Sequence, residues 1–259
     1  MQNNIFSGQS LRQKLIVFDE IGSTNDYLKT QLSNFKPLPE WSAIMAKFQN
    51  NGRGQRQNSW KVEPNTNITF SFVIYPSYLN PQQHFILNML VSVGIIDWLK
   101  SLNLDALIKW PNDILLSNKK ISGILIENKI NHKEIKQSVI GIGVNVNQKR
   151  FPDELDKIAS SVFNESGILT KNLEEECLNL FSFIANRIEN YRTNNLKDKD
   201  LLEQYNNLLF RKNIPALYTA NSETFEAVLT KVDENGLLHL LKKNKEETYF
   251  FKEVVFVMQ

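Results

Sequence analysis

Apolar and polar residues alternate along this chain in patterns typical of strands and of helices. Runs rich in β-branched and aromatic residues, bounded by turn residues or proline, predict strands at 14–18, 43–46, 67–75, 104–108, 113–116, 121–127 and 138–146. Helical spacing of apolar residues predicts helices from Pro81 through Ile96, from Leu173 through Ile188 and around 201–210. Another helix is expected at Ser23-Thr24-Asn25, because these residues are preferred N-caps.

The pattern changes after Arg211-Lys212-Asn213. Residues 214–259 form short strand-like runs separated by turn residues, which predicts a small module resembling a β-barrel. We expect most of its aromatic residues, among them Tyr218, Phe225, Tyr249 and Phe250, to lie in its core. The sequence therefore predicts an α+β domain with a mixed, largely antiparallel sheet, followed by a small all-β domain.

Composition narrows the class of protein. The chain has 259 residues, of which 42% are hydrophobic and 22% charged, as in ordinary globular proteins. A formal net charge of only +2 gives no electrostatic case for nucleic-acid binding. No apolar run approaches the ~20 residues of a membrane helix, and the polar start does not resemble a signal peptide. The single cysteine, Cys177, is compatible with a reducing compartment, so we expect a cytoplasmic protein.

Two polar segments interrupt the first part of the chain. Residues 20–25 place Ser23, Thr24 and Asn25 at a strand-to-helix turn, where they could bind a small polar group or simply cap a helix. Residues 49–60 contain Gly52-Arg53-Gly54, whose glycines permit close backbone approach and whose arginine could bind phosphate or carboxylate. A solvated basic loop is the alternative for this second segment. It lacks the sequence of a phosphate-binding P-loop.

Two further polar segments lie in the predicted sheet. Lys109-Trp110-Pro111-Asn112-Asp113 precedes the hairpin that carries Lys120, so strand pairing should bring Lys109, Asn112, Asp113 and Lys120 near one another. An ordinary lysine at a hairpin tip is the alternative for Lys120. Residues 141–147 alternate glycine with apolar residues and asparagine, which would let a ligand, or a packed helix, lie on the strand.

Together these segments, in this order, resemble the biotin–protein ligase family. The resemblance is carried by Gly52-Arg53-Gly54, by 109–113, by Lys120 through Glu127, and by 141–145, and it covers roughly residues 14–150. It implies a catalytic domain related to class II synthetases over 1–212 and an SH3-like domain over 213–259. It also implies ATP, Mg²⁺ and biotin as ligands, and a biotin carboxyl carrier domain of a biotin-dependent carboxylase as the partner.

The resemblance assigns a role to each polar segment. The residues implied to bind biotin are Ser23, Thr24, Asn25, Gln49, Gly52, Arg53, Gly54, Gln55 and Lys120. The residues implied to bind ATP are Arg53, Arg56, Trp60, Asn112, Asp113 and Asn145, with Asp113 as a candidate magnesium ligand. Arg53 and Lys120 would be catalytic, because they offset the repulsion between a carboxylate and the α-phosphate. No nucleophile of the protein is required, since the amine of the carrier lysine attacks the adenylate.

The sequence also departs from the family pattern. Gln55, Gln57 and Asn58 stand where relatives often have arginine and glycine, which puts retention of the adenylate in question. About a dozen residues precede the first strand, too few for the helix-turn-helix domain of repressor-type members. Two alternatives remain: a lipoate or octanoate ligase or transferase on the same scaffold, and a biotin sensor without catalysis. A homodimer formed through a sheet edge would fit the family.

Overall fold

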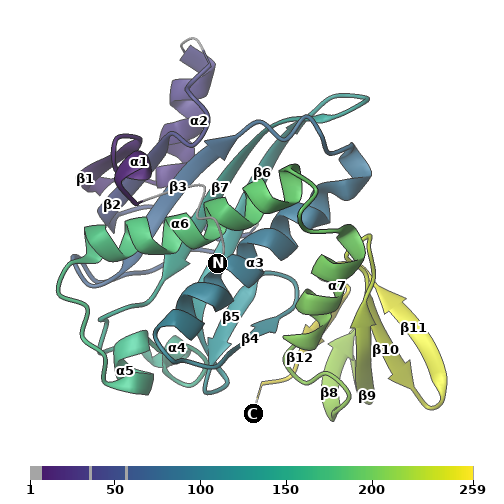
Figure 1. The fold of residues 1–259 in the computed structure, drawn as a ribbon. Coiled ribbons are helices and arrows are strands. Elements are labelled where there is room, and N and C mark those ends of the chain that lie inside the picture. The colour runs from purple at the N-terminus through teal and green to yellow at the C-terminus, as the bar shows by residue number, and fades with distance from the viewer. Residues whose placement is uncertain (1–7, 35–36, 56–57, 259) are drawn as a thin grey trace.

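The chain folds around two sheets (Figure 1). The structure is a computed structural model that describes residues 8–34, 37–55 and 58–258. The larger sheet has the spatial order β1-β2-β3-β7-β6-β5-β4. Its strands are β1 Leu15–Ile21, β2 Ala43–Gln49, β3 Ile68–Ile74, β4 Ala106–Lys109, β5 Asp113–Leu116, β6 Lys119–Ile130 and β7 Ile135–Val144. Only β1 and β2 pair in parallel, so the expected mixed, largely antiparallel sheet is confirmed.

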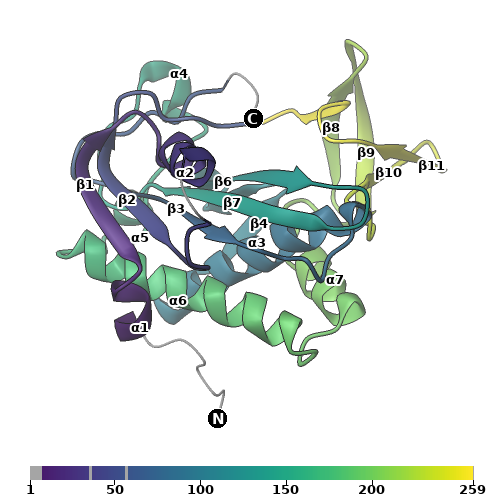
Figure 2. The same cartoon turned by 90° about the horizontal axis from the view of Figure 1, so that it is seen from above.

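Helices cover the two faces of this sheet unequally. Figures 1 and 2 show α3 and α6 on one face, whereas α2 lies on the other near the β1 end. The helices are α1 Gly8–Arg12, α2 Thr24–Asn34, α3 His84–Ser101, α4 Asp153–Asp156, α5 Val162–Ser166, α6 Leu173–Arg192 and α7 Asp198–Asn207, with a 3₁₀ turn at Pro81–Gln83. No helix in the described part of the chain is long and apolar enough to span a membrane.

Alternate side chains of strand β3 face opposite sides of the sheet. Phe70 and Phe72 point toward α6, with their ring centroids 5.7 and 4.9 Å from that of Phe181. Because side chains alternate along a strand, the intervening Thr69 and Ser71 face the opposite side. Both are buried, at 2% and 0% exposure, although they are polar. The helices α3 and α6 therefore enclose the apolar core, and the other face of the sheet is left for polar contacts.

Two helices begin differently from the sequence prediction. Pro81 opens a 3₁₀ turn capped by Asn80, and the α-helix proper starts at His84. The helix expected around 201–210 instead spans Asp198–Asn207. Its first turn contains Asp198 and Asp200, whose charges are favourable at the positive end of the helix dipole. The helix therefore starts three residues earlier than predicted, and its first turn is charged.

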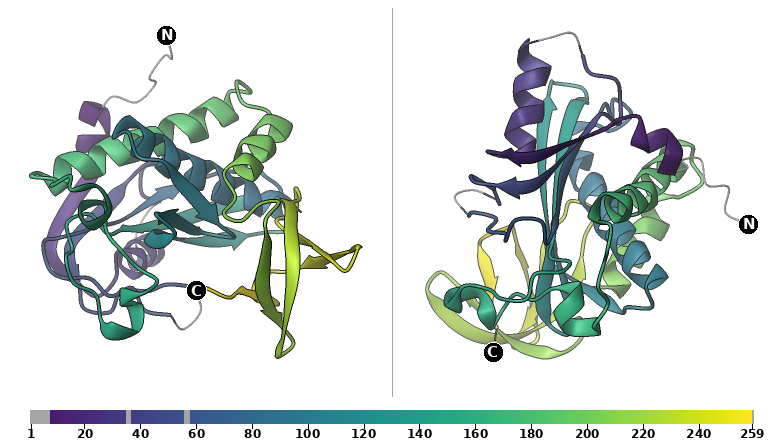
Figure 3. Two further views of the ribbon diagram at one scale, coloured as in Figure 1. Left: turned by 90° about the horizontal axis from the view of Figure 1, so that it is seen from below. Right: turned by 90° about the vertical axis from the view of Figure 1, so that its left-hand side faces the viewer.

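The smaller sheet contains the C-terminal strands. Its spatial order is β11-β10-β9-β8-β12, with every neighbouring pair antiparallel. The strands are β8 Pro215–Ala220, β9 Glu223–Val232, β10 Leu238–Lys242, β11 Lys245–Tyr249 and β12 Val254–Phe256. Figure 3 shows it beside the large sheet. The sheet begins close to the predicted boundary at 212/213; the division into two domains stays a prediction.

The small sheet packs on the larger one. Trp110, between β4 and β5, donates from Nε1 to the carbonyl of Gly236 at 3.0 Å. A Cβ on Gly236, where φ is +82°, would lie only 2.7 Å from the Phe85 ring, so glycine allows this close contact. Tyr218 and Phe225 are buried, as expected. Phe250 is 64% exposed, so the expectation of a core position is wrong for it.

Candidate functional site

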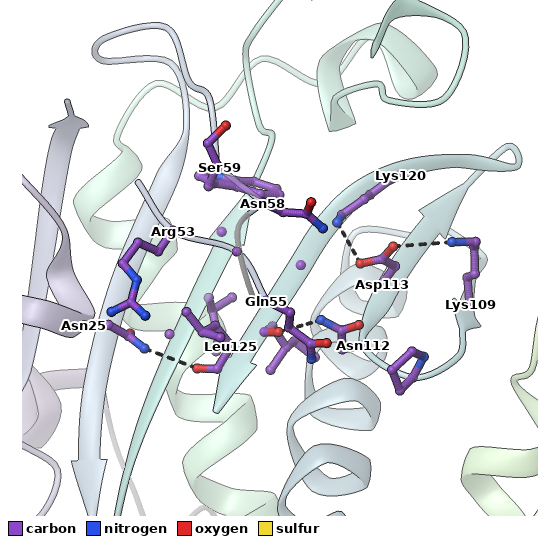
Figure 4. A pocket seen from close by; sticks show the side chains of 18 of the residues that line it. Asn25, Arg53, Gln55, Asn58, Ser59, Lys109, Asn112, Asp113, Lys120 and Leu125 are labelled. Carbon is purple, nitrogen blue, oxygen red and sulfur yellow. Dashed lines mark hydrogen bonds and ion pairs between the residues drawn. The ribbon is translucent and has the colours of Figure 1, made fainter. Parts of the chain in front are cut away.

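A cavity of about 520 Å³ lies on the face of the large sheet that carries Thr69. All four polar segments of the sequence contribute to it or to an adjoining cavity, and so does the C-terminal strand. Figure 4 labels residues from the first three segments around the cavity. The predicted site residues that line it are Ser23, Thr24, Asn25, Gln49, Arg53, Gly54, Gln55, Trp60, Asn112, Asp113 and Lys120. Arg56 and Gln57 lie outside the described residues. The fold thus brings together residues as far apart in the sequence as Ser23 and Phe256.

One end of the cavity is a buried network of neutral polar groups. The Thr24 backbone N–H and hydroxyl donate to Oε1 of Gln49, at 2.7 and 3.1 Å. Ser71 Oγ lies 2.6 Å from Thr24 Oγ1 and 2.5 Å from Asn25 Oδ1. Thr24, Asn25 and Gln49 are each less than a tenth exposed. Buried polar atoms are costly unless paired, so this end of the cavity is fixed before any ligand arrives.

Asn25 is held against the sheet from two sides. Its Nδ2 donates to Glu127 Oε2 at 2.8 Å and points toward the carbonyl of Leu125 at 3.4 Å. A Cβ on Gly141 would lie 2.2 Å from Asn25 Oδ1, so only glycine lets this side chain lie on β7. The glycine that the sequence suggested for a ligand or a packed helix therefore accommodates a side chain of the site.

The loop from Gln49 to Trp60 folds back on itself. Gly54 N–H donates to the carbonyl of Asn58 at 2.7 Å, and Trp60 N–H donates to that of Gly52 at 2.9 Å. A Cβ on Gly52 would come within 2.4 Å of the Trp60 carbonyl oxygen, which explains the need for glycine. Gln55 Oε1 is buried in the cavity wall, with no hydrogen-bond partner in the described part of the chain. Its capacity to accept a hydrogen bond is therefore unused among the described residues.

Arg53 is part of a cluster of four charged side chains. Its guanidinium pairs with Asp26, and its Nη2 lies 3.6 Å from Glu127 Oε1. Lys29 contacts the same two carboxylates, at 3.0 and 2.8 Å. Burial alone would raise the pKa of Asp26, but hydrogen bonds from Lys29 and Arg53 outweigh it and hold that pKa below its usual value. The charge of Arg53 is thus already compensated by acids outside the cavity.

Trp60 lies flat on the two central strands. A Cβ on Gly143 would come within 2.3 Å of its indole, and one on Gly123 within 3.3 Å. Its ring nitrogen is buried without a partner among the described residues, and Lys120 Nζ lies 5.6 Å from the ring centroid. Trp60 lines both the main cavity and a second cavity of about 480 Å³ beside it. The indole therefore forms a wall between the two spaces.

The other end of the main cavity is cationic. Asp113 Oδ1 lies 2.7 Å from Lys120 Nζ, and its Oδ2 lies 3.6 Å from Lys109 Nζ (Figure 4). Pairing of β4 with β5 places Lys109 opposite Asp113, and β5–β6 pairing adds Lys120, as expected from the sequence. Asp113 is the only acidic residue among the described residues lining the cavity. Two lysines share one carboxylate, which leaves an excess positive charge.

Two of the predicted ATP-binding residues also donate hydrogen bonds to backbone carbonyls of the fold. Asn112 donates from Nδ2 to the carbonyl of Ile124 at 2.7 Å. Asn145 is buried and donates to the carbonyl of Ser160 at 2.9 Å, and it lines the second cavity and not the first. Leu155, Ile158 and Ala159 supply an apolar wall there. The second cavity thus joins an apolar surface to the cationic end of the first.

Sequence reasoning missed three parts of this site. Ser71 and Glu127, which orient Thr24 and Asn25, received no role. Ser71 could have been found, because a polar residue in the apolar strand 67–75 invites the question of its partner. The C-terminal contribution, from Phe251 through Phe256, had no local signal. It depends on how the small sheet packs against the large one.

No ligand set for a metal emerges from the described residues, since they contain no group of three or more histidine, cysteine, aspartate or glutamate side chains suited to one. Cys177 is fully buried in α6, and burial raises the pKa of its thiol. It lines neither cavity. The described chain therefore offers no thiol nucleophile to the site.

Comparison with known proteins gives this site a context. Residues 17–145 match the model of the biotin/lipoate A/B protein ligase family. The bifunctional ligase/repressor BirA of Bacillus spizizenii is 35% identical over 158 residues, which cover 60% of this chain and 48% of that protein. BirA of Escherichia coli is 28% identical, covering 66% and 51%. The chain spans about half the length of the curated relatives it matches.

Solved structures extend the similarity to nearly the whole chain. A biotin protein ligase of Aquifex aeolicus in complex with biotin and ATP superposes with a TM-score of 0.76 at 21% identity, covering 95% of this chain and all of that one. A biotin acetyl coenzyme A carboxylase synthetase of Helicobacter pylori, with bound biotinylated ATP, gives 0.59 at 26% identity, covering 91% and 99%. At 21% identity, the likeness to the Aquifex aeolicus structure shows only that the two chains share a fold, which includes the C-terminal sheet.

Proposed function

The chain belongs to the biotin/lipoate A/B protein ligase family, and we propose that it is a biotin–protein ligase. It would activate biotin with ATP and transfer the biotinyl group to a lysine of a carrier protein. One observation carries the proposal: a buried neutral polar network and a cationic pair of lysines stand at opposite ends of one cavity. Biotin has the matching ends, a neutral ureido ring and a carboxylate.

The polar end suits the ureido ring. Thr24, Asn25, Gln49 and the N-cap Ser23 offer hydroxyl and amide groups in a fixed arrangement. Gln55 Oε1, an acceptor without a partner among the described residues, would suit a ureido N–H. Gly52 and Gly54 let the loop backbone lie close to the ligand. Burying neutral donors and acceptors is favourable when each finds a partner, which a ureido group supplies.

The cationic end suits the first chemical step. A carboxylate oxygen of biotin attacks the α-phosphorus of ATP, a P–O bond forms, and the bond to pyrophosphate breaks. Two anions must approach, so Lys120 and Arg53 would offset their repulsion and stabilise the charge that develops. Lys120 is already at the cavity wall, whereas Arg53 would have to exchange Asp26 for the ligand.

The second step needs no group of the protein as nucleophile. The uncharged amine of the acceptor lysine attacks the carbonyl carbon of the adenylate, an amide bond forms, and AMP leaves with the bonding electrons. The amine's extra proton passes to solvent or to AMP. Excluding water from the cavity would protect the mixed anhydride from hydrolysis. We assign that protection to the loop from Gln49 to Trp60.

ATP would occupy the second cavity and the cationic end. Trp60 and the apolar Leu155 and Ile158 suit a nucleobase, with Asn112, Asp113 and Asn145 on the nucleotide side. Asp113 fits magnesium only as a minor ligand, because both its oxygens already face lysines. The phosphates of ATP would supply most of the ligands of Mg²⁺, which usually binds proteins through few carboxylates. When bound, Mg²⁺ neutralises phosphate charge.

A lipoate or octanoate ligase is the alternative on this scaffold. A dithiolane or an alkyl chain would leave the donors and acceptors of Thr24, Asn25 and Gln49 facing an apolar group, which is costly. A transferase with an acyl-enzyme intermediate would need a cysteine in the cavity, and the single cysteine of the chain is buried in α6. A thermal-shift comparison of biotin with lipoate and octanoate separates these activities.

The finer assignments belong to the same proposal. The acceptor would be the biotin carboxyl carrier domain of a biotin-dependent carboxylase, and the reaction would occur in the cytoplasm, without nucleic acid or membrane as partner. A homodimer would form through the edge strand β1, where Ile16 is 56% exposed. Gel filtration of the purified chain at several concentrations tests the dimer.

The direct test combines two assays. Incubation with biotin, MgATP and a carrier domain should add one biotinyl group to the carrier, detected by mass. Exchange of labelled pyrophosphate into ATP should depend on biotin and not on lipoate. Exchange that biotin does not stimulate would show that the assignment is wrong.

A further inference from the structure

Lys252 has an unusual backbone conformation. It lies in the turn between β11 and β12 with φ of +82°, the largest positive φ of any described residue other than glycine, equalled only by Gly236. Most other described residues with positive φ are asparagine or serine. Such a φ is unfavourable for a lysine, because its Cβ crowds the backbone. A strained residue that persists invites the question of what its side chain does.

The turn around Lys252 is fixed by its neighbours. Glu253 N–H donates to the carbonyl of Phe250 at 3.1 Å, and Phe250 N–H donates to a carboxylate oxygen of Glu253 at 2.7 Å. Phe251 packs its ring edgewise on Trp110, with the centroids 6.0 Å apart. The small sheet thereby presents Lys252 beside the turn that follows Lys109.

Lys252 lines the main cavity with Lys109 and Lys120. Those two lysines share Asp113, whereas Lys252 makes no ion pair with any described residue. Its ammonium lies 5.2 Å from the Phe251 ring centroid, a contact that leaves its hydrogen-bond donors free. The side chain is half-buried, so it loses part of its hydration and would gain most from an anionic partner.

We infer that Lys252 binds the phosphate chain of ATP, which makes the small C-terminal sheet part of the active site. The inference rests on the proposed function and names a residue of that same site. Phe251 contacts Trp110, and Lys109 Nζ lies 5.5 Å from the ring centroid of Phe256, so the segment that carries Lys252 meets the cavity at its cationic end. The triphosphate is the most highly charged group that this end would receive.

Lys252→Gly distinguishes the effect of the lysine side chain from the effect of the backbone conformation. Lys252→Gly removes the ammonium and also relieves the strain, so the melting temperature should stay level or rise. The Kd of a non-hydrolysable ATP analogue, measured by calorimetry, should rise roughly tenfold, as expected for loss of one charge-assisted contact. The KM for ATP in pyrophosphate exchange should rise likewise, whereas the KM for biotin should not change.

Matched variants complete the test. Lys252→Arg keeps the positive charge and should therefore retain most of the ATP affinity of the unmodified protein. Lys243→Gly is the control, because Lys243 also has positive φ, +48°, but lies in the β10–β11 turn and lines neither cavity. It should leave ATP binding unchanged.

Two outcomes would overturn the inference. One is unchanged affinity for the ATP analogue in Lys252→Gly, and the other is an equal loss of biotin and ATP binding, which would indicate general damage to the cavity. Absence of biotin-stimulated exchange in the unmodified protein would instead contradict the proposed function. The binding measurement would still decide the role of Lys252.

Discussion

At the scale of single residues, neighbouring lysines of the β5–β6 hairpin provide a matched comparison. Lys120 faces Asp113 in the main cavity, whereas Lys119 lines neither cavity. Lys120→Ala should slow adenylation far more than Lys119→Ala, because a charge-assisted contact contributes about 1.5–3 kcal/mol and more where charge develops. Single-turnover formation of biotinyl-adenylate measures both variants. Equal rates in the two would remove Lys120 from its catalytic role.

Gly141 provides a second comparison at this scale. In Gly141→Ala the new methyl group would lie 2.2 Å from Asn25 Oδ1 and force Asn25 out of its network with Ser71. We expect the KM for biotin to rise roughly tenfold or more, because a buried polar group loses its partner. Gly22→Ala is the control, since its Cβ would meet nothing closer than 3.8 Å. Similar KM values for biotin in both variants would contradict this role of Gly141.

These residues also show how far the sequence predicts a site. The closeness of Lys109, Asp113 and Lys120 follows from strand pairing alone, and the structure confirms it. The hydrogen bond from Asn25 Nδ2 to Glu127 cannot be predicted from any local sequence pattern. It depends on β6 and α2 meeting in space. Roles in binding and catalysis stay predictions until they are measured.

At the scale of elements, the charged cluster of Asp26, Lys29, Arg53 and Glu127 joins helix α2 and strand β6 to the loop that carries Arg53. If the loop closes over ligand, Arg53 must exchange these acids for anionic oxygens. We predict that this loop is mobile when empty, because its glycines and polar residues bury little apolar surface. The cluster indicates what restrains Arg53 in the absence of ligand.

Limited trypsin digestion tests this exchange, because trypsin cuts after arginine. Cleavage after Arg53 should be slowed by biotin with MgATP, while cleavage elsewhere changes little. Asp26→Asn should accelerate cleavage after Arg53 in the empty protein, because it removes one of the two acids that hold the guanidinium. If ligands leave the cleavage rate after Arg53 unchanged, the loop does not order over them, and Arg53 loses its proposed role in closure.

The elements were mostly predictable, and the exceptions have physical causes. Strand β3 and helix α6 follow from their own periodicity. The close approach of α3 to α6 at Gly94, where a Cβ would lie 3.0 Å from Ile184 Cα, does not. The helix predicted around 201–210 starts earlier, at Asp198, because acids are favourable at a helix N-terminus although they carry no apolar periodicity.

At the scale of the whole molecule, the main difference from the sequence prediction is the fifth contributor to the site. Pattern and resemblance both placed the chemistry in the first 150 residues. The small sheet nevertheless supplies Phe251, Lys252 and Val255 to the cavity wall. Its packing depends on single contacts, such as Trp110 with Gly236, that have no periodic signature. A truncation near residue 212 is therefore expected to remove part of the active site as well as a separate module.

The same sheet suggests where a protein acceptor touches the enzyme. Val255 is 59% exposed and lines the cavity, and Phe250, in the turn before β12, is 64% exposed. The acceptor lysine must enter this cavity, so the acceptor surface around that lysine has to pass these apolar side chains. The cationic cavity wall, with Asp113 as its only described acid, favours acceptors with acidic residues near the lysine. We therefore expect the carrier domain to pack on Val255 and Phe250.

Charge substitution at this surface should affect the protein acceptor and spare a small one. Val255→Glu should raise the KM for the carrier domain at least about tenfold, or about 1.4 kcal/mol, because it buries a charge in an apolar contact and repels acidic residues. Transfer of the biotinyl group to hydroxylamine should proceed at the unmodified rate, since that acceptor needs no docking surface. Leu169→Glu is the control, because Leu169 is exposed to a similar extent, 57%, and lines neither cavity. Equal carrier KM values for the two variants would place the docking surface elsewhere, and a matching loss of transfer to hydroxylamine would mean that Val255→Glu had damaged the active site itself.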